Sequence, residues 1–533
     1  MGCNVRCGDY PLAPSGGRLK PMSRRSTLRL GTRGSLLAVA QSRLVLRALR
    51  GLDPGQPLEL VSVETRGDRD RDTPLSAVGD PGFFSAELDR ALLTGQVDFC
   101  VHSVKDLPLE PRPGIRQAAV PAREQPHDVV LFRADAAELI ASDQPLRIGT
   151  SSTRRATLAG GFLREALPRL GAQPPQLAFA PLRGPVEQRL ARLRLPRAHP
   201  QALDGAVLAL AGLARLWGDR DGHAALAPLL QDTRLMLLPL SACPTAAGQG
   251  ALAVDCRDGD ARVAGLLAQL HDAATARRVA RELSLAAALP AGERDGFAAS
   301  SLPDANCGTL LFMAGSGAAR PYHRLAWRRP PPPAGARAWD GSDWAGASHL
   351  RRIARPSAGN PGALFLAHWR AWPDAAPMPP DTRVWVSGVE SWRQLARRGV
   401  WVEGCADNLG FRAITPLLAT AVLRLPPLAD WTVMTREDAV ASWHDSGIGR
   451  VQATYAIDSP SDPVALAAIR AGLAQSTHFY WGSAAQFQAL RDWLPTDAHH
   501  ACGPGKTFQA LRAQGVGNLH PFPSRQEWRS WLA

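Results

Sequence analysis

The chain has 533 residues, and its 61 Lys and Arg against 48 Asp and Glu give a formal net charge of +13. A single hydrophobic core stops growing at about 250–300 residues, so a chain of this length is expected to form roughly three to five domains. No apolar run approaches the ~20 residues of a membrane-spanning helix, which argues against a membrane protein.

The positive charge would ordinarily suggest a nucleic-acid partner. Nearly all of it is arginine scattered along the chain, however, and the lysines are only Lys20, Lys105 and Lys506. Stacking aromatic residues accompany no basic run, so we expect no nucleic-acid binding. The eight cysteines include no CxxC pair and no Cys/His cluster with zinc spacing. This pattern favours a reducing cytoplasm and no structural metal.

Residues 1–26 are polar, basic and rich in Gly and Pro, with no apolar stretch typical of a signal peptide, and we expect a disordered leader. Strands are then predicted at 27–31 and 58–65, and Ser35 should cap a helix that runs to about residue 50. After a charged, turn-rich segment at 66–82, a helix at about 83–93 follows.

The next stretch, Val97 to Pro108, is an apolar strand that ends in Lys105 and Asp106. The βαβαβ order predicts an α/β unit with a mainly parallel sheet, and the strand tip should open into a cleft that binds a ligand. Alternatively, Lys105 and Asp106 form an ordinary solvated pair.

A second α/β unit begins near Val129. Its strand at 146–149 runs into Thr150–Arg155, where hydroxyls and two arginines start a helix. Such a helix N-terminus can bind an anion, although plain N-capping would produce the same pattern. A similar arrangement of hydroxyls and an arginine occurs at Gly31–Ser35, and this recurrence favours the anion-binding interpretation over plain N-capping.

Arginines also follow the later strands of this unit. Arg183 and Arg189 come after a strand at 177–182, and Arg215 comes after a strand-to-turn segment at 206–213. Residues 248–256 return as a strand to the first unit. Two units with basic strand tips describe a cleft for a ligand that bears several carboxylates.

The rest of the chain contains a helical segment at 261–290, short β pieces at 296–328 and a Pro/Arg-rich linker at 326–361. Beyond the linker, α/β patterning resumes to residue 533. Ser391-x3-Leu395-x3-Gly399 and Thr507-x3-Leu511-x3-Gly515 form an internal repeat that suggests two similar units. Capped helices in general also have this pattern, so the repeat does not settle the matter.

Seven motifs occur in order between residue 27 and about 325: LRLGTRGSLLAVAQ, VETRGDRDRDTPL, VHSVKDLP, IGTSSTRRA, PLRGPVEQRL, LALAGLARL and AAGQGALAVDCR. With them the chain resembles porphobilinogen deaminase, also called hydroxymethylbilane synthase. The resemblance implies two lobes like those of periplasmic binding proteins and a small third α/β domain. The corresponding boundaries are 27–125 with 245–265, 126–244 and 266–325.

The resemblance also implies roles for the matched residues. Asp106 would stabilise the positive charge on the pyrrole nitrogen as porphobilinogen loses ammonia, with Lys105 beside it. The expected product is a linear polypyrrole, hydroxymethylbilane or an atypical chain, made by a monomeric cytoplasmic enzyme. Acetate and propionate side chains would be bound by a set of mainly cationic residues: Arg33, Ser35, Lys105, Ser151, Arg154, Arg155, Arg183, Arg189 and Arg215.

One position departs from the family. Relatives carry a Leu-x-Gly-Gly-Cys motif whose cysteine holds a dipyrromethane cofactor by a thioether, whereas this chain has Leu289 to Glu293, with Glu293 at the cysteine position. A carboxylate cannot form that thioether. Cys307, in what should be a different strand, is a poor substitute. Pro81 also stands where the family usually has lysine.

Residues 362–533 resemble uroporphyrinogen-III synthase, a two-domain α/β enzyme, through Val384–Gly399, Thr477–Ala484 and Ala501–Thr507. The segment is short for that enzyme. Ser483 and Thr507 would contact a ligand at helix N-termini. Two functions remain open: an enzyme that condenses porphobilinogen, and a non-catalytic protein that binds porphobilinogen or a linear tetrapyrrole.

Overall fold

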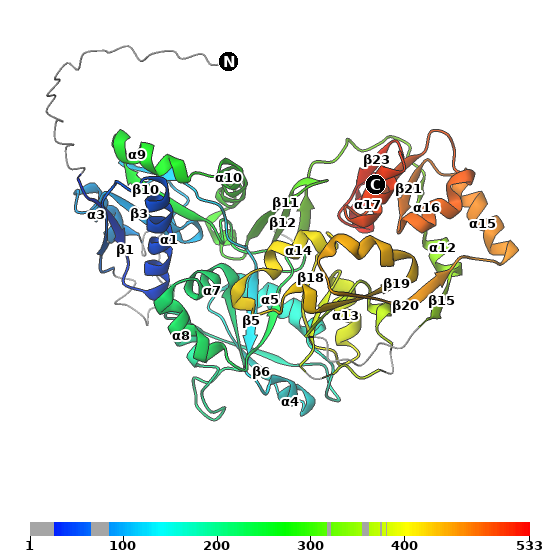
Figure 1. The fold of residues 1–533 in the computed structure, drawn as a ribbon, viewed down its shortest axis with the longest axis horizontal. Helices are drawn as coiled ribbons and strands as arrows, with labels where there is room; N and C mark the ends of the chain where they lie inside the picture. The colour runs from blue at the N-terminus through cyan, green and yellow to red at the C-terminus, as the bar shows by residue number, and fades with distance from the viewer. Residues whose placement is uncertain (1–25, 66–84, 317–320, 354–361, 374–375, 380) are drawn as a thin grey trace, which may run out of the picture.

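The computed structural model describes residues 26–65, 85–316, 321–353, 362–373, 376–379 and 381–533, and these residues form five β-sheets with flanking helices (Figure 1). Residues 1–25 of the predicted leader, the segment at 66–82 and Pro81 lie outside the described residues. Among the helices that are described, none combines the length and apolar character needed to span a membrane.

The first sheet has the strand order β2-β1-β3-β10-β4, with β1, β2 and β3 parallel and β10 antiparallel to its neighbours. The predicted return of the chain to this sheet is therefore confirmed. Ser35 caps α1 as expected, since its Oγ accepts a hydrogen bond from the Ala38 N–H. The elements are β1 (Leu28–Thr32), α1 (Leu36–Leu52), β2 (Leu58–Ser62), α3 (Ala86–Leu93), β3 (Phe99–Ser103), β4 (Ile115–Ala119) and β10 (Leu252–Arg257).

The second sheet has the order β7-β6-β8-β5-β9. The strand-to-turn segment predicted at 206–213 is a strand up to Ala209, and the predicted turn is the start of a helix, because α7 begins at Leu210. Its elements are β5 (Asp128–Phe132), α4 (Ala136–Ala141), β6 (Leu146–Gly149), α5 (Thr153–Ala166), β7 (Leu177–Ala180), α6 (Val186–Ala191), β8 (Gly205–Ala209), α7 (Leu210–Trp217), α8 (Arg220–Leu230) and β9 (Arg234–Leu237).

The third sheet is a small antiparallel meander, β11-β12-β13, which α10 packs against. Buried apolar residues such as Ala286 of α10, Phe297 and Leu311 form the contact. The elements are α9 (Ala261–Leu267), α10 (Ala273–Ala287), α11 (Ala291–Arg294), β11 (Ala298–Asp304), β12 (Gly308–Ser316) and β13 (Pro321–Ala326).

The C-terminal part contains two further sheets. The fourth has the order β15-β20-β19-β16-β17-β18, and the fifth, which is parallel, has the order β14-β21-β22-β23. Their strands are β14 (Ala338–Trp339), β15 (His349–Arg352), β16 (Ala363–Leu366), β17 (Arg383–Val386), β18 (Val402–Cys405), β19 (Trp431–Arg436), β20 (Arg450–Asp458), β21 (His478–Trp481), β22 (His499–Cys502) and β23 (Leu519–Pro521).

The linker predicted at 326–361 needs a correction. β14 and β15 both lie within it and pair with β21 and β20, and α12 (Ser342–Ala347) lies between them. Main-chain hydrogen bonds to distant strands hold these short segments, and composition carries no signal of such pairing. Both sheets of the C-terminal part therefore begin before residue 362.

The internal repeat corresponds to α13 (Val389–Ala396) beside the fourth sheet and α17 (Lys506–Ala513) beside the fifth. Leu395 and Leu511 are fully buried. Gly399 and Gly515 end the two helices with positive φ angles of 79° and 75°, a conformation that glycine adopts without strain. Each sheet of the C-terminal part thus carries one copy of the repeat.

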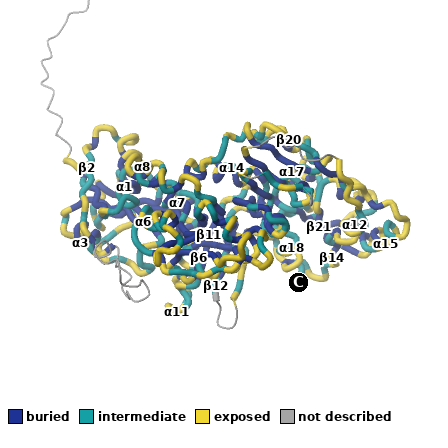
Figure 2. The backbone as a smooth tube through the Cα atoms, turned by 90° about the horizontal axis from the view of Figure 1, so that it is seen from below, coloured by how far each residue is buried: buried dark blue, intermediate teal, exposed yellow. Residues whose placement is uncertain are grey.

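Two of the hydrophobic cores cross from the second sheet into the fourth. The Trp392 indole of α13 donates a 3.0 Å hydrogen bond to the Ala166 carbonyl of α5, and Trp401 donates one of 3.1 Å to the Leu235 carbonyl of β9. Asp407 accepts from the Leu240 N–H at 2.8 Å. Buried segments accordingly run through both halves of the molecule (Figure 2).

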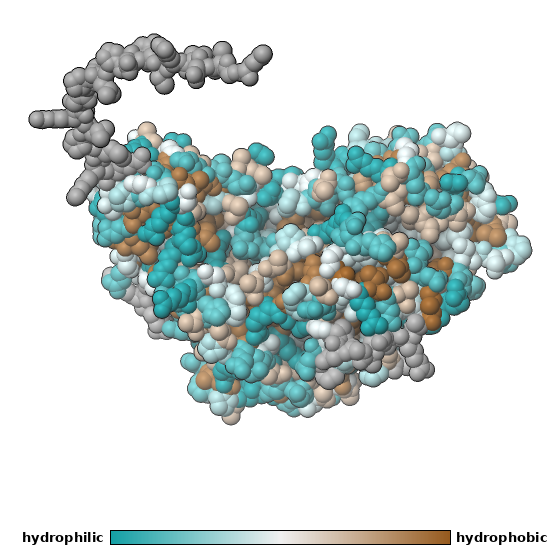
Figure 3. Space-filling view, viewed as in Figure 1, coloured by the Kyte–Doolittle hydropathy of each residue, from teal (hydrophilic) through white to brown (hydrophobic). Residues whose placement is uncertain are grey.

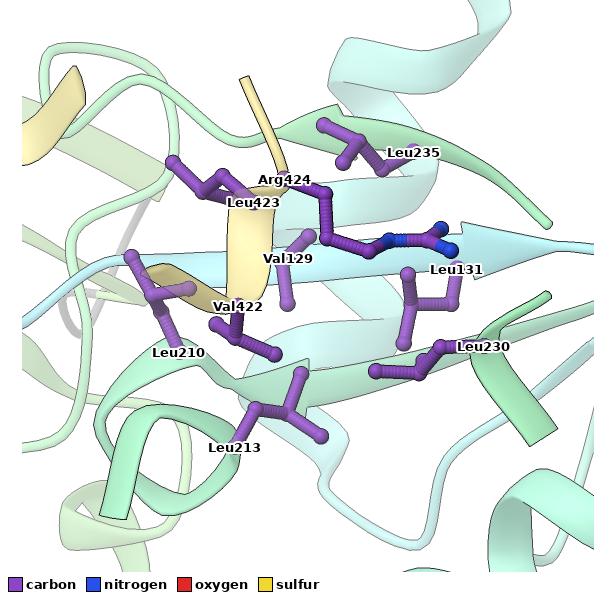
Figure 4. Close-up of a pocket in the computed structure, with 9 residues that line it drawn as sticks. All are labelled: Val129, Leu131, Leu210, Leu213, Leu230, Leu235, Val422, Leu423 and Arg424. Atoms are coloured by element: carbon purple, nitrogen blue, oxygen red, sulfur yellow. The ribbon is translucent and has the colours of Figure 1, made fainter. Parts of the chain in front are cut away.

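An apolar cavity of about 10 Å³ lies within this contact, between β5, α7 and the 3-10 turn Ala421–Leu423 (Figure 4). The outer surface differs from this interior, because the face drawn in Figure 3 is mostly hydrophilic, with small hydrophobic patches. The cavity is lined by aliphatic side chains and by Arg424, and it belongs to the packing between the two sheets. Its lining residues are Val129, Leu131, Leu210, Leu213, Leu230, Leu235, Val422, Leu423 and Arg424.

Candidate functional site

Lys105 and Asp106 form a single 3-10 turn, η1 (Val104–Asp106), directly after the buried strand β3. Asp106 is exposed, and Lys105 is half-buried. Asp106 stands at a cavity of about 70 Å³ between β3 and α1, as the strand-tip prediction requires. The polar residues of the lining are Arg33, Ser35, Gln41, Ser85, His102, Ser103 and Asp106.

Burial controls the ionisation of two groups here. It lowers the pKa of Lys105 to about 8; the Asp106 carboxylate acts in the opposite direction, and the Arg155 guanidinium lowers the pKa further. Burial, with the charge of Arg112, also lowers the pKa of His102 to about 4. At neutral pH the site therefore contains a mainly protonated lysine and a neutral imidazole.

The hydroxyls and arginines of Thr150–Arg155 stand at the start of α5 as predicted, with Ser152 as the N-cap. Both arginines bind the carboxylate of Asp128 at the start of β5. Arg155 contacts it at 2.7 and 3.1 Å, and Arg154 at 3.3 Å. The anion at this helix terminus is thus a side chain of the protein itself, which the sequence reasoning missed.

Asp128 is almost completely buried. Burial alone raises the pKa of its carboxyl group, but Arg155 and Arg154 outweigh that effect, and the net pKa is lowered. Asp128 is consequently a permanent anion at neutral pH. Its charge compensates part of the positive charge that the two buried guanidiniums bring into the protein.

The two serines among the predicted ligands have structural contacts. The Ser35 hydroxyl caps α1, and the Ser151 hydroxyl accepts from the Leu182 N–H at 2.9 Å and donates to the Leu182 carbonyl at 3.1 Å. Arg33 and Ser35 both line the cavity at which Asp106 stands. Of these three residues, Arg33 is the one that brings a positive charge to that cavity.

Arg189 is close enough to Arg155, Asp106 and Arg183 for their charges to affect it. Burial lowers its pKa to about 10, the neighbouring arginines lower it further, and Asp106 opposes them. Arg215 is buried on α7, where it donates a 2.6 Å hydrogen bond to the Gly250 carbonyl. The structure therefore places Arg189 within reach of the charges of Asp106 and Arg183, and both Arg189 and Arg215 donate to main-chain carbonyls, Arg189 to that of Gly184 at 2.7 Å.

Gln249 is a second residue that the sequence reasoning missed. Its side chain lies between Lys105, Asp128 and Arg155, and only 1% of it is exposed. The signal was present in the motif Gly248-Gln249-Gly250, which we interpreted as the start of a strand and as part of a family motif, without assigning a role to Gln249.

Glu293 lies on the short helix α11 and is half-buried. The next residue, Arg294, forms a 3.3 Å ion pair with Glu110, which is four residues after Asp106. Four residues of chain span at most roughly 14 Å, so this helix lies near the segment that carries Asp106.

Cys307 is buried between the third and fifth sheets, where it packs with Phe522, and burial raises its pKa to about 12. The six cysteines within the described residues are all buried. In the C-terminal part, the Ser483 hydroxyl caps α16 (Ala484–Leu490), and Thr507 lies in the first turn of α17.

A family model described as the dipyromethane cofactor binding domain of porphobilinogen deaminase matches residues 28–265. A porphobilinogen deaminase of Sorangium cellulosum is 38% identical over 308 residues, which are 56% of this chain and 92% of the relative. The chain belongs to the porphobilinogen deaminase family. Porphobilinogen deaminase 1 of Streptomyces coelicolor is 40% identical over 265 residues, 50% of this chain and 75% of the relative.

A further porphobilinogen deaminase, from Syntrophotalea carbinolica, is 38% identical over 257 residues, which cover 48% of this chain and 72% of that protein. The span matched by the family model holds the first and second sheets and the residues around Asp106. Porphobilinogen deaminase character is thus established for about half of the chain.

Proposed function

We propose that this chain condenses porphobilinogen, with loss of ammonia, into a linear polypyrrole. The observation that carries the proposal is the position of Asp106: it is exposed at a polar cavity, next to Lys105 and within electrostatic reach of Arg189. A negative charge beside a developing cation lowers the energy of the transition state, which is the role proposed for the Asp106 carboxylate.

In the proposed reaction, Arg33, Arg183 and Arg189 bind substrate carboxylates, and Lys105 adds positive charge below about pH 8. The C–N bond of the aminomethyl group breaks, and ammonia leaves with the electron pair. Asp106 stabilises the resulting cation on the pyrrole. A second pyrrole then forms a C–C bond with the methylene carbon, and its ring proton passes to the Asp106 carboxylate and from there to the released ammonia.

The dipyrromethane cofactor of the family fits this chain only in part. The arginines suit its carboxylates, but Glu293 offers no sulfur for a thioether, and the described cysteines are buried. No step above therefore passes through a bound cofactor. In this proposal, free porphobilinogen or a transient ester of Glu293 starts the chain, and the product is hydroxymethylbilane or an atypical polypyrrole.

The C-terminal part, in this proposal, is a uroporphyrinogen-III synthase-like region that binds or cyclises the product. Its two α/β sheets, each with one copy of the repeat helix, support this assignment. Ser483 and Thr507, both at helix N-termini, are the proposed ligand contacts.

The test is incubation of the purified full chain with porphobilinogen, followed by measurement of substrate loss, ammonia release and product mass. Asp106→Asn should reduce kcat by roughly 10²–10³-fold, the range seen when one transition-state electrostatic contact is removed. The exposed Asp492 serves as a matched control, and Asp492→Asn should leave the rate unchanged. An inactive wild-type chain would overturn the proposal.

Glu293→Cys probes the primer position in the same preparation. We expect this variant to gain the mass of a covalent pyrrole adduct when incubated with porphobilinogen, whereas the wild type keeps its polypeptide mass or gains an ester that hydroxylamine removes. A stable adduct on the wild-type chain would contradict the assigned role of Glu293.

A second candidate function is a non-catalytic protein that binds porphobilinogen or a linear tetrapyrrole. Glu293 in place of a thiol favours it, because loss of the anchor stops processive elongation but leaves the arginines in place. Calorimetry with porphobilinogen separates the two: binding without ammonia release supports the binding protein, and turnover that depends on Asp106 excludes it.

A further inference from the structure

The segment Gly248–Gly250 has a backbone that only glycine accommodates at both ends. Gly248 and Gly250 have φ angles of 74° and 87°. A Cβ atom on Gly248 would approach Val104 Cγ1 to 2.6 Å, and one on Gly250 would approach the Glu124 carbonyl oxygen to 2.5 Å. The two glycines therefore let the chain pass close to η1 and turn Gln249 inward.

Three charged side chains hold the main chain of this segment. Arg123 Nε donates to the Gln249 carbonyl at 2.8 Å, and Arg215 donates to the Gly250 carbonyl at 2.6 Å. The Gly248 N–H donates to Glu282 of α10 at 2.8 Å, and the Glu282 carboxylate also pairs with Arg123. All three side chains are more than nine-tenths buried, so the backbone of Gln249 has little freedom to move.

Both polar atoms of the Gln249 side-chain amide make two hydrogen bonds each. Its Nε2 donates to the Pro126 carbonyl at 2.7 Å and to Asp128 at 2.8 Å. Since these contacts need the NH2 group, the amide oxygen must face the other way. There it accepts from Lys105 Nζ at 3.2 Å and from Arg155 at 3.4 Å.

These contacts join the two sheets that carry the site, since Lys105 follows β3 of the first sheet while Asp128 and Arg155 belong to the second. We propose that Gln249 is a positioning residue, whose single amide oxygen holds the Lys105 ammonium and the Arg155 guanidinium at a fixed separation across the two sheets.

A methionine at this position has a similar length but offers no amide oxygen, so Lys105 loses its acceptor. Because that acceptor stabilises the charged ammonium, its loss lowers the pKa of Lys105 and increases the share of deprotonated amine. A glutamate keeps an acceptor oxygen for Lys105, but its second oxygen meets the Pro126 carbonyl and the Asp128 carboxylate, so the glutamate binds a proton there and adds no charge. Gln249→Met should therefore shift the ionisation of Lys105, whereas Gln249→Glu should keep it close to that of the wild type, a difference that general loosening of the fold would not produce.

In the test, the full chain is treated with acetic anhydride at a series of pH values between 6 and 10. The reagent acylates the deprotonated amine, and mass spectrometry of peptides then measures how much of each lysine is labelled. The chain has only three lysines, so the Lys105 peptide is distinct. In the wild type its labelling should be half-maximal near pH 8. Gln249→Met should raise Lys105 labelling at pH 7 by about threefold or more, and Gln249→Glu, which keeps the acceptor, should leave it near the wild-type level.

Lys506, whose pKa burial and the charge of Arg412 lower to about 7, serves as the internal reference and should be labelled equally in every variant. Gln488→Met on the exposed face of α16 is the matched control. Equal Lys105 labelling in the wild type and both variants, or an equal increase in both variants, would overturn the proposal.

A second readout rests on the proposed function. If the chain consumes porphobilinogen, Gln249→Met should lower kcat/KM by about 10–10²-fold, because displaced cations misplace the substrate carboxylates. A change below twofold would count against the positioning role. The labelling result needs no turnover, so an inactive wild-type chain with shifted Lys105 labelling would refute the enzymatic function and leave the role of Gln249 intact.

Discussion

Replacement of Trp392 by alanine tests whether the C-terminal part and the second sheet share one core. Trp392 lies on α13 but is completely buried against α5. Its ring meets Phe162 edge-on, with centroids 5.1 Å apart, and its N–H donates to the Ala166 carbonyl at 3.0 Å. Both contacts belong to the second sheet's helix, although more than 200 residues separate the partners in sequence.

Truncation of a buried Trp or Phe to alanine costs about 3–5 kcal/mol, because the site collapses only partly around the missing side chain. Trp392→Ala also removes an aromatic pair worth about 0.5–1.5 kcal/mol. We therefore expect Trp392→Ala to lower the free energy of unfolding by about 5 kcal/mol, the upper end of the range for truncation. Trp392→Phe keeps most of the ring and loses the N–H donor, so its cost should be about 1–3 kcal/mol.

The assay is urea unfolding combined with hydrogen exchange of the α5 and α13 amides. In Trp392→Ala, protection should fall in both helices. The control is Trp493→Ala, which removes a half-buried ring next to the fifth sheet and should leave α5 unchanged. A Trp392→Ala protein whose α13 exchanges faster while α5 exchanges at the wild-type rate would refute the shared core.

Two further substitutions probe buried charges. Burial raises the pKa of Asp407 from 3.8 to about 6, against the opposing effect of Ser241. The stability linked to this proton is fully present below about pH 4 and is lost as the pH rises through about 6, so between about pH 4 and pH 7 the wild type should lose about 3 kcal/mol of unfolding free energy relative to Asp407→Asn. Urea titrations of both proteins at several pH values measure the difference. Asp128→Asn leaves the guanidiniums of Arg154 and Arg155 without their carboxylate and should cost about 3–5 kcal/mol at pH 7; a loss below 1 kcal/mol would show that the carboxylate is dispensable.

Local signals predicted many individual elements well. The strand at 146–149 matches β6, Ser35 caps α1, and the return of the chain through β10 agrees with the expected return to the first sheet. Each of these rests on a pattern of neighbouring residues, such as an apolar run or a hydroxyl before a helix. The linker prediction failed because β14 and β15 are held by strands more than 100 residues away.

By itself, the sequence determined which polar residues stand at strand tips and helix starts, and it carried the family motifs around Asp106. Only the tertiary structure decided which partners those residues have. Asp128 neutralises part of the charge of Arg154 and Arg155, Gln249 links Lys105 to the second sheet, and the C-terminal part shares a core with it. The physical reason is that burial and ion pairing arise between residues distant in sequence, and a side chain's identity does not specify its partner.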